Sequence, residues 1–285
     1  MPRHPAWVAF LAVLTCNPPA AAADAPAAPR TVDIRPIAHK AWGNSPERVQ
    51  AILHAAAQEL DRHFAAPLLK PILVEPLGGP ITLFDRGPGG EYRVQLDTGD
   101  NLWAQWVYQF AHEFGHIRSS FDSVSHQNKW FEETICEVAS LYVLRRLAVV
   151  WAEDGRPDAW KKFAPALRKY VEARVAKAQL AEDVNFPEWY AAHARELHRN
   201  GYDREKNTII AVRLLPLFEK TPEHWEAIGL LAKAKKGHAE TLPEFLKAWQ
   251  AQCPEKHRAF VAAVAQSFGI DLAKVTLTPA KEIAK

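Results

Sequence analysis

The stretch that decides the fold reads His112-Glu113-Phe114-Gly115-His116, with two histidines four positions apart. Residues at this spacing lie one above the other on an α-helix, so both imidazoles can bind one metal ion from the same face. Glu113 lies beside them, within reach of a water molecule on that metal. The spacing therefore predicts a helix through residues 112–116 with a metal site on one side of it.

The residues around this stretch divide the predicted helix into two faces. At about 100° per residue, one face collects apolar side chains, namely Trp103, Trp106, Val107, Phe110, Phe114 and Ile117. His112 and His116 project from the opposite side, and Glu113 lies between the two sets. Asp100 or Asn101 can cap the start of the helix. A helix that buries its apolar stripe against a sheet would direct both histidines into a cleft.

A zinc site in a hydrolase also needs a third protein ligand, and the next predicted helix offers carboxylates. This helix contains Trp130-Phe131-Glu132-Glu133-Thr134-Ile135-Cys136-Glu137. Helical spacing places Glu133 and Glu137 together, one turn apart, and directs Glu132 well away from both. We expect Glu133 to be the third ligand and Glu137 to hold a ligand histidine through its free ring N–H. The reverse assignment of these two carboxylates stays open.

This arrangement resembles the gluzincin metallopeptidases, a group that includes thermolysin and the zinc aminopeptidases. The resemblance rests on residues 112–116, the sixteen residues that follow, and then Glu133. In that group the third ligand is a Glu on the helix after the motif helix, often preceded by Asn, whereas Glu132 precedes it here. The likeness covers about residues 101–145. Neither the Gly-x-Met-Glu-Asn stretch of aminopeptidases nor the metzincin continuation after His116 is present.

The resemblance implies a zinc-dependent metallopeptidase that hydrolyses peptide or protein substrates. Its Zn²⁺ would polarise the peptide carbonyl and bind the attacking water, with Glu113 as the general base that passes the proton to the leaving amine. It also implies an upstream edge strand that receives the substrate, for which residues 92–96 are the candidate. Tyr202 is the candidate hydrogen-bond donor to the oxyanion. Its competitors are His126, Tyr190 and His193.

Two other functions stay open at this point. The first is a metal-containing binding or scaffold protein without turnover, although Glu113 argues against it because a structural site needs no general base. The second is a zinc amidohydrolase that acts on a non-protein amide with the same residues.

The rest of the chain predicts an α+β fold that is predominantly α. Ser45-Pro46-Glu47 begins a helix that continues to about Phe64. Three β-prone runs follow at 72–75, 81–84 and 92–96, and residues 85–90 have the composition of a hairpin loop. Helical periods then cover 130–151, 157–180, 187–199, 204–219, 222–236, 241–252 and 254–268. The prediction is a small antiparallel sheet with a helix upstream of a two-helix zinc site, followed by a helical C-terminal lobe.

The N-terminus has the pattern of a targeting segment. Arg3 and His4 precede a short apolar run, and Ala21-Ala22-Ala23 supplies small residues for cleavage before Asp24. We therefore expect a signal peptide over 1–23, a Pro/Ala-rich linker over 24–35, a metallopeptidase-like catalytic region over 36–155 and the helical lobe over 156–285. The mature chain is then expected to be periplasmic or secreted.

Charge and cysteine content restrict the partners. A formal net charge of +2 without a Lys/Arg-rich run predicts no nucleic-acid partner. No transmembrane segment is expected, because Arg145 and Arg146 interrupt the most apolar stretch, residues 138–151. Lipidation of Cys16 is a less favoured alternative to cleavage after the alanines. Cys136 and Cys253 could form a disulfide, but a buried free thiol is favoured for Cys136.

Overall fold

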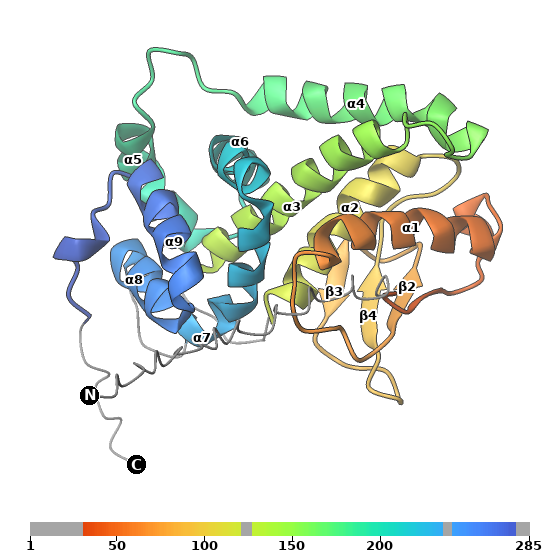
Figure 1. Ribbon diagram of the computed structural model, residues 1–285, viewed down its shortest axis with the longest axis horizontal. Coiled ribbons are helices and arrows are strands. Elements are labelled where there is room, and N and C mark those ends of the chain that lie inside the picture. Colours follow the sequence, from red (N-terminus) through yellow and green to blue (C-terminus); the bar gives the residue numbers. More distant parts are fainter. Residues whose placement is uncertain (1–30, 121–126, 236–240, 278–285) are drawn as a thin grey trace, which may run out of the picture. The chain divides into compact units, whose positions relative to one another are not determined.

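The computed structural model describes residues 31–120, 127–235 and 241–277. Within these residues the chain is mainly helical, with one four-stranded sheet in its N-terminal part, which confirms the predicted fold class (Figure 1). The predicted signal peptide and His126 lie outside the described residues. From Thr31 onward the chain packs as one unit, and the boundary near residue 155 stays a prediction.

The sheet is mixed rather than antiparallel. Strand β1 (Ile34–Pro36) pairs parallel with β2 (Ile72–Glu75), and β2 pairs parallel with β4 (Tyr92–Gln95). Strand β3 (Ile81–Leu83) is antiparallel to β4, which confirms the hairpin predicted around residues 85–90. The antiparallel prediction is wrong for the other two pairs. For the first pair the reason is that β1 begins within the predicted linker, and the helix between β1 and β2 makes the crossover that parallel strands require. For the second pair, β3 intervenes between β2 and β4 in the chain and runs antiparallel to β4, so β2 and β4 run in the same direction.

The strand order is β1-β2-β4-β3, so β3 is an edge strand and β4 is an inner one. The prediction that residues 92–96 form the free edge is therefore wrong, because β4 has hydrogen-bonded neighbours on both sides. Strand β3 contacts the helix that carries the histidines. It is thus the edge strand that borders the predicted site.

Helix α1 (Pro46–Asp61) begins as predicted. The Ser45 hydroxyl oxygen accepts a hydrogen bond from the Arg48 backbone N–H, at 3.4 Å. The buried side of α1 carries Val49, Ile52, Leu53, Ala56 and Leu60. This side packs against the strands and the motif helix, as Figure 1 shows. Burial of each large aliphatic side chain contributes roughly 1.5–3 kcal/mol to the stability of the fold. Helix α1 therefore stabilises the packing of the sheet beside the motif helix.

Helices α2 (Trp103–Arg118) and α3 (Lys129–Val150) pack along each other and carry the predicted site. Most of α3 is buried on every side, as is typical of a helix enclosed by others. The predicted caps of α2 are wrong, since its N-cap residue is Leu102. Asn101 instead accepts a hydrogen bond from Asn44, at 2.8 Å, and Asp100 adopts a positive φ of 51° in the preceding turn.

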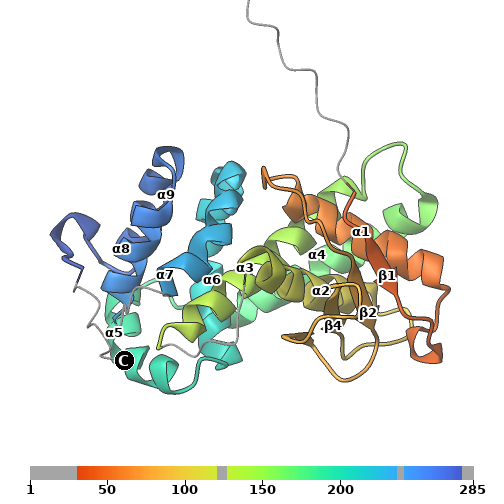
Figure 2. The same ribbon diagram turned by 90° about the horizontal axis from the view of Figure 1, so that it is seen from below.

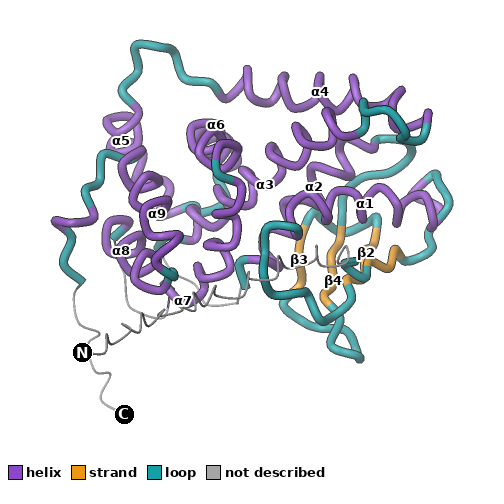
Figure 3. The backbone as a smooth tube through the Cα atoms, viewed as in Figure 1, coloured by secondary structure: helices purple, strands orange, loops and turns teal. Residues whose placement is uncertain are grey.

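The helices after α3 agree closely with the predicted segments. They are α4 (Asp158–Ala178), α5 (Phe186–Arg199), α6 (Arg204–Lys220), α7 (Leu231–Lys235), α8 (Leu242–Gln252) and α9 (Glu255–Ser267). The predicted helix 222–236 divides into a 3₁₀ helix (Pro222–Leu230) and α7. Helices α5, α6, α8 and α9 lie on the opposite side of α3 from the sheet (Figure 2), and the strands gather at one end only (Figure 3). Among the described helices, none is long and apolar enough to cross a bilayer.

Candidate metal centre

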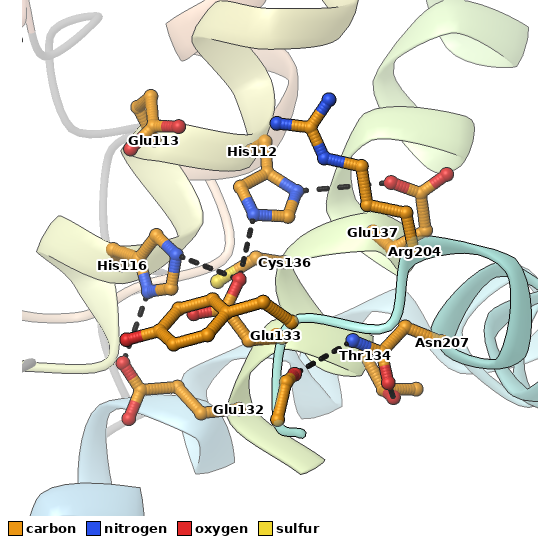
Figure 4. Close-up of polar contacts among 12 residues, drawn as sticks. His112, Glu113, His116, Glu132, Glu133, Thr134, Cys136, Glu137, Arg204 and Asn207 are labelled. Carbon is orange, nitrogen blue, oxygen red and sulfur yellow. Dashed lines mark hydrogen bonds and ion pairs between the residues drawn. The ribbon is translucent and has the colours of Figure 1, made fainter. Parts of the chain in front are cut away.

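Helices α2 and α3 bring the three predicted ligands together (Figure 4). His112 Nε2 lies 3.3 Å from Glu133 Oε2, and His116 Nε2 lies 3.5 Å from the same oxygen. All three side chains line one cavity of about 570 Å³. Glu133 thus faces both imidazoles from the neighbouring helix, which is the position that a third ligand requires.

Cys136 also belongs to this group. The ligand atoms of His112, His116 and Cys136 all lie within 4.8 Å of one another. A buried His–His–Cys group of this kind could hold a metal ion. The sequence predicted a buried free thiol beside the site, and both Cys136 and Cys253 are free and buried, so the alternative disulfide is not formed.

Gly115 explains how α3 can approach α2 so closely. A Cβ atom at this position would lie 3.1 Å from Cys136 Sγ and 3.2 Å from Cys136 Cα. The Cα atom belongs to the backbone of α3, which cannot move without moving the whole helix. The glycine of the motif is therefore set by the packing of the two helices, and it keeps Cys136 beside the histidines.

Gly115→Ala is expected to destabilise the fold by about 1–3 kcal/mol, because overpacking outweighs the helix preference of alanine, about 1 kcal/mol. Displacement of α3 would also move Glu133 and weaken metal binding. Urea unfolding and zinc titration measure the two effects. Gly229→Ala is the control, since the nearest atom to its Cβ would lie at an ordinary contact distance of 3.4 Å. Equal losses in both variants would contradict the packing argument.

The outer ring nitrogens of both histidines have carboxylate neighbours. Glu137 Oε2 lies 3.7 Å from His112 Nδ1, where the sequence placed it. Glu132 Oε1 lies 2.9 Å from His116 Nδ1. A carboxylate that accepts a hydrogen bond from Nδ1, as Glu132 does from His116, fixes the tautomer that leaves Nε2 available to a metal. The prediction that Glu132 points away from the site is wrong, because a helical wheel ignores the reach of the side chain toward a crossing helix.

Further contacts hold these carboxylates in place. The Tyr108 hydroxyl lies 2.7 Å and 2.6 Å from the two oxygens of Glu137, to which it donates. Lys129 Nζ lies 3.2 Å from Glu132 Oε1 and 3.5 Å from Glu133 Oε1. Each of the three buried carboxylates therefore has a polar partner besides the imidazoles, which offsets part of the cost of burying charge.

The electrostatics of the site favour positive charge between the helices. Burial lowers the pKa of His112, but the neighbouring carboxylates of Glu133 and Glu137 outweigh this effect and raise the pKa to about 10. Burial also opposes a charge on His116, yet Cys136 and the neighbouring carboxylates raise its pKa well above the usual value. Burial raises the pKa of Glu133, but the two histidines hold it well below its usual range. A metal cation would satisfy the same negative potential that protons satisfy here.

Glu113 lines the same cavity but is held by the sheet rather than by α3. Its Oε2 accepts a hydrogen bond from the Thr82 hydroxyl on β3, at 2.8 Å. Both residues are buried, with 3% and 4% of their surfaces exposed. Figure 4 shows the Glu113 side chain apart from the cluster around Glu133. Thr82 is absent from the residues that the sequence predicts for the site, because its only distinguishing feature is a hydroxyl in a short apolar strand.

Of the three described candidates for the oxyanion donor, Tyr202 is the one that lines the cavity. It is 67% exposed and lies in the turn before α6. Tyr190 is packed on Trp130, with ring centroids 5.6 Å apart, and lies outside the cavity. His193 is also outside it, and its Nδ1–H donates to the Trp189 carbonyl at 2.7 Å. Tyr202 therefore stays the candidate donor to the oxyanion.

No protein-family model, curated protein or solved structure matches this chain.

Proposed function

We propose that this chain is a zinc-dependent metallopeptidase of the gluzincin type. The observation that carries the proposal is the position of Glu133 Oε2, 3.3 Å and 3.5 Å from the Nε2 atoms of His112 and His116. Each imidazole has a second carboxylate at its other nitrogen. Paired imidazoles, a carboxylate ligand and outer carboxylates are the arrangement that catalytic zinc sites use.

The chemistry of the donors fits zinc. Imidazole nitrogen and carboxylate oxygen are the ligands of His₂Glu hydrolases, and a thiol is equally compatible with zinc. The donors adjoin a cavity on one side, which leaves room for water and substrate. His112, His116 and Glu133 would hold the ion, with Cys136 as the nearby alternative donor.

The remaining residues of the cavity have roles in peptide hydrolysis. A zinc ion, when bound, supplies a Lewis acid for the substrate carbonyl. Glu113 takes the proton of the attacking water and returns it to the leaving amine. Thr82 holds the Glu113 carboxylate through its hydroxyl. The exposed Tyr202 hydroxyl donates a hydrogen bond to the oxyanion of the substrate.

The edge strand of the sheet favours an extended peptide as substrate. Pro80, Ile81, Thr82 and Phe84 line the cavity along β3, and Ile81 and Phe84 are exposed there. An extended peptide can add to a free strand edge through main-chain hydrogen bonds. Its side chains would then meet the two exposed apolar residues. Strand β3 thus takes the role that the sequence assigned to residues 92–96.

The test of this proposal combines zinc content by mass spectrometry with cleavage of a peptide library. We expect about one zinc ion per chain, and cleavage that stops when a chelator is added and returns with zinc. A chain without zinc would contradict the proposal. Zinc without cleavage would favour the scaffold protein, and hydrolysis of non-protein amides alone would favour the amidohydrolase. Periplasmic or secreted location stays a prediction from the N-terminal sequence.

Thr82→Val is expected to lower kcat about tenfold with little change in KM, because Glu113 loses a hydrogen bond to its charged carboxylate. Valine keeps the shape of threonine but lacks the hydroxyl. Thr82→Ser, which keeps the hydroxyl, should retain most of the activity. Steady-state kinetics on one peptide measure all three proteins. A change confined to KM, or a serine variant as slow as the valine variant, would exclude this positioning role.

A further inference from the structure

Arg145 and Arg146 interrupt the apolar C-terminal half of α3, and the metal centre makes no use of them. In the structure both line a second cavity, of about 790 Å³. Its walls come from the end of α1, from α3 and α4, and from the end of α6. None of its lining residues belongs to the cavity of the metal centre.

Four arginines line this second cavity, and they come from three different helical elements. They are Arg62 at the end of α1, Arg145 and Arg146 on α3, and Arg168 on α4. The carboxylates that line the cavity or pair with these arginines are Glu59, Glu172 and Glu219. Among these residues the arginines thus outnumber the carboxylates, four to three, around an open cavity.

The ion pairs use only part of each guanidinium group. Glu219 contacts Arg145 through Nη1 alone, at 2.9 Å and 3.0 Å. Glu59 accepts from Arg146 Nε, at 3.1 Å. Within the described part of the chain, the other nitrogens of these two arginines have no hydrogen-bond partner, and the side chains are 37% and 40% exposed. Arg168 has no ion pair with any described residue.

The remaining walls are partly apolar. Ala148, Val149 and Val171 line the cavity beside the arginines. His63 also lines it, and burial together with Arg62 and Arg146 lowers the pKa of His63 to about 4. Both arginines therefore lie close enough to act on this imidazole, against the opposing charge of Glu223.

We propose that this second cavity binds a small organic molecule that carries an oxyanion, either a phosphate or a carboxylate group. The unused nitrogens of Arg145 and Arg146, together with Arg168, hold the oxyanion. Guanidinium groups bind such groups through paired N–H donors. The bound charge offsets the excess of cations, and the apolar wall accommodates the organic part of the molecule.

Isothermal titration calorimetry at constant ionic strength tests this site on the full chain. The probes are inorganic phosphate, glycerol phosphate and citrate, with sodium chloride as the control for charge screening. We expect saturable binding of at least one probe with a Kd below about 1 mM. Preference for the phosphates or for citrate identifies the oxyanion. No saturable binding of any probe would overturn the proposal and leave four solvated arginines.

Arg168→Gln is the decisive variant, because loss of the Arg168 guanidinium group breaks no ion pair with any described residue. The affinity of this variant for the probe that the wild type binds should fall about tenfold, as expected for loss of a charge-assisted hydrogen bond. Arg195→Gln removes the same charge from the exposed surface of α5 and should bind as the wild type does. Equal losses in both variants would overturn the site. NMR titration gives a second readout, in which the bound anion raises the pKa of His63.

Discussion

Glu113→Gln is expected to lower kcat for peptide hydrolysis by about 10²–10⁴-fold while zinc content stays unchanged. The amide has the shape of the carboxylate but cannot accept the proton of the attacking water. Glu113 is buried, and its carboxylate is held by the Thr82 hydroxyl, whose hydrogen bond the amide oxygen can still accept. The variant should therefore fold as the wild type does, and kinetics with zinc analysis of the same sample separate catalysis from metal binding.

Glu182→Gln is the matched control, since it removes an exposed carboxylate from the loop before α5. An active Glu113→Gln protein would exclude Glu113 as the general base. Loss of zinc from that variant would mean that Glu113 holds the metal instead. If wild type and variant both bind zinc and neither cleaves any substrate, the result favours the scaffold protein over the peptidase.

The grouping of side chains in the candidate metal centre could largely be predicted from the sequence, because its geometry is local. Four-residue spacing places His112 and His116 on one face of a helix, whatever the helix packs against. The same rule places Glu133 and Glu137 on one face of the next helix. The packing of α2 on α3 is then the one long-range contact that brings these two pairs of side chains together. Gly115 permits that packing, since any Cβ there would crowd the backbone of α3.

Apart from the N-cap of α2, the features that differ from the prediction depend on contacts between elements far apart in the chain. Glu132 was expected to point away, yet it reaches His116 across the helix interface. Strand order is likewise set by pairing between distant segments, so short apolar runs could not show that β4 is an inner strand and β3 the edge. Thr82 could not be recognised as a partner of Glu113 until β3 was known to border α2.

Glu133→Ala is expected to weaken zinc binding by more than about 100-fold, because it removes the carboxylate oxygen that lies 3.3 Å and 3.5 Å from the two Nε2 atoms. Glu137→Gln and Glu132→Gln should each weaken it by about 10–100-fold, the usual cost of losing a carboxylate behind a ligand histidine. Competition with a chelating dye measures the affinities. Urea unfolding of each variant checks that the fold persists, and Glu182→Ala is the surface control.

Cys136→Ser decides whether the thiol or Glu133 completes the metal centre. Both lie beside the imidazoles, but Glu133 Oε2 lies 3.3 Å and 3.5 Å from the two Nε2 nitrogens. We therefore expect Cys136→Ser to retain zinc within about threefold, a smaller change than the loss of an outer carboxylate produces. Loss of zinc from Cys136→Ser, with zinc retained by Glu133→Ala, would reverse the assignment. The centre would then be a His–His–Cys site, and Glu133 would serve the substrate or the water rather than the metal.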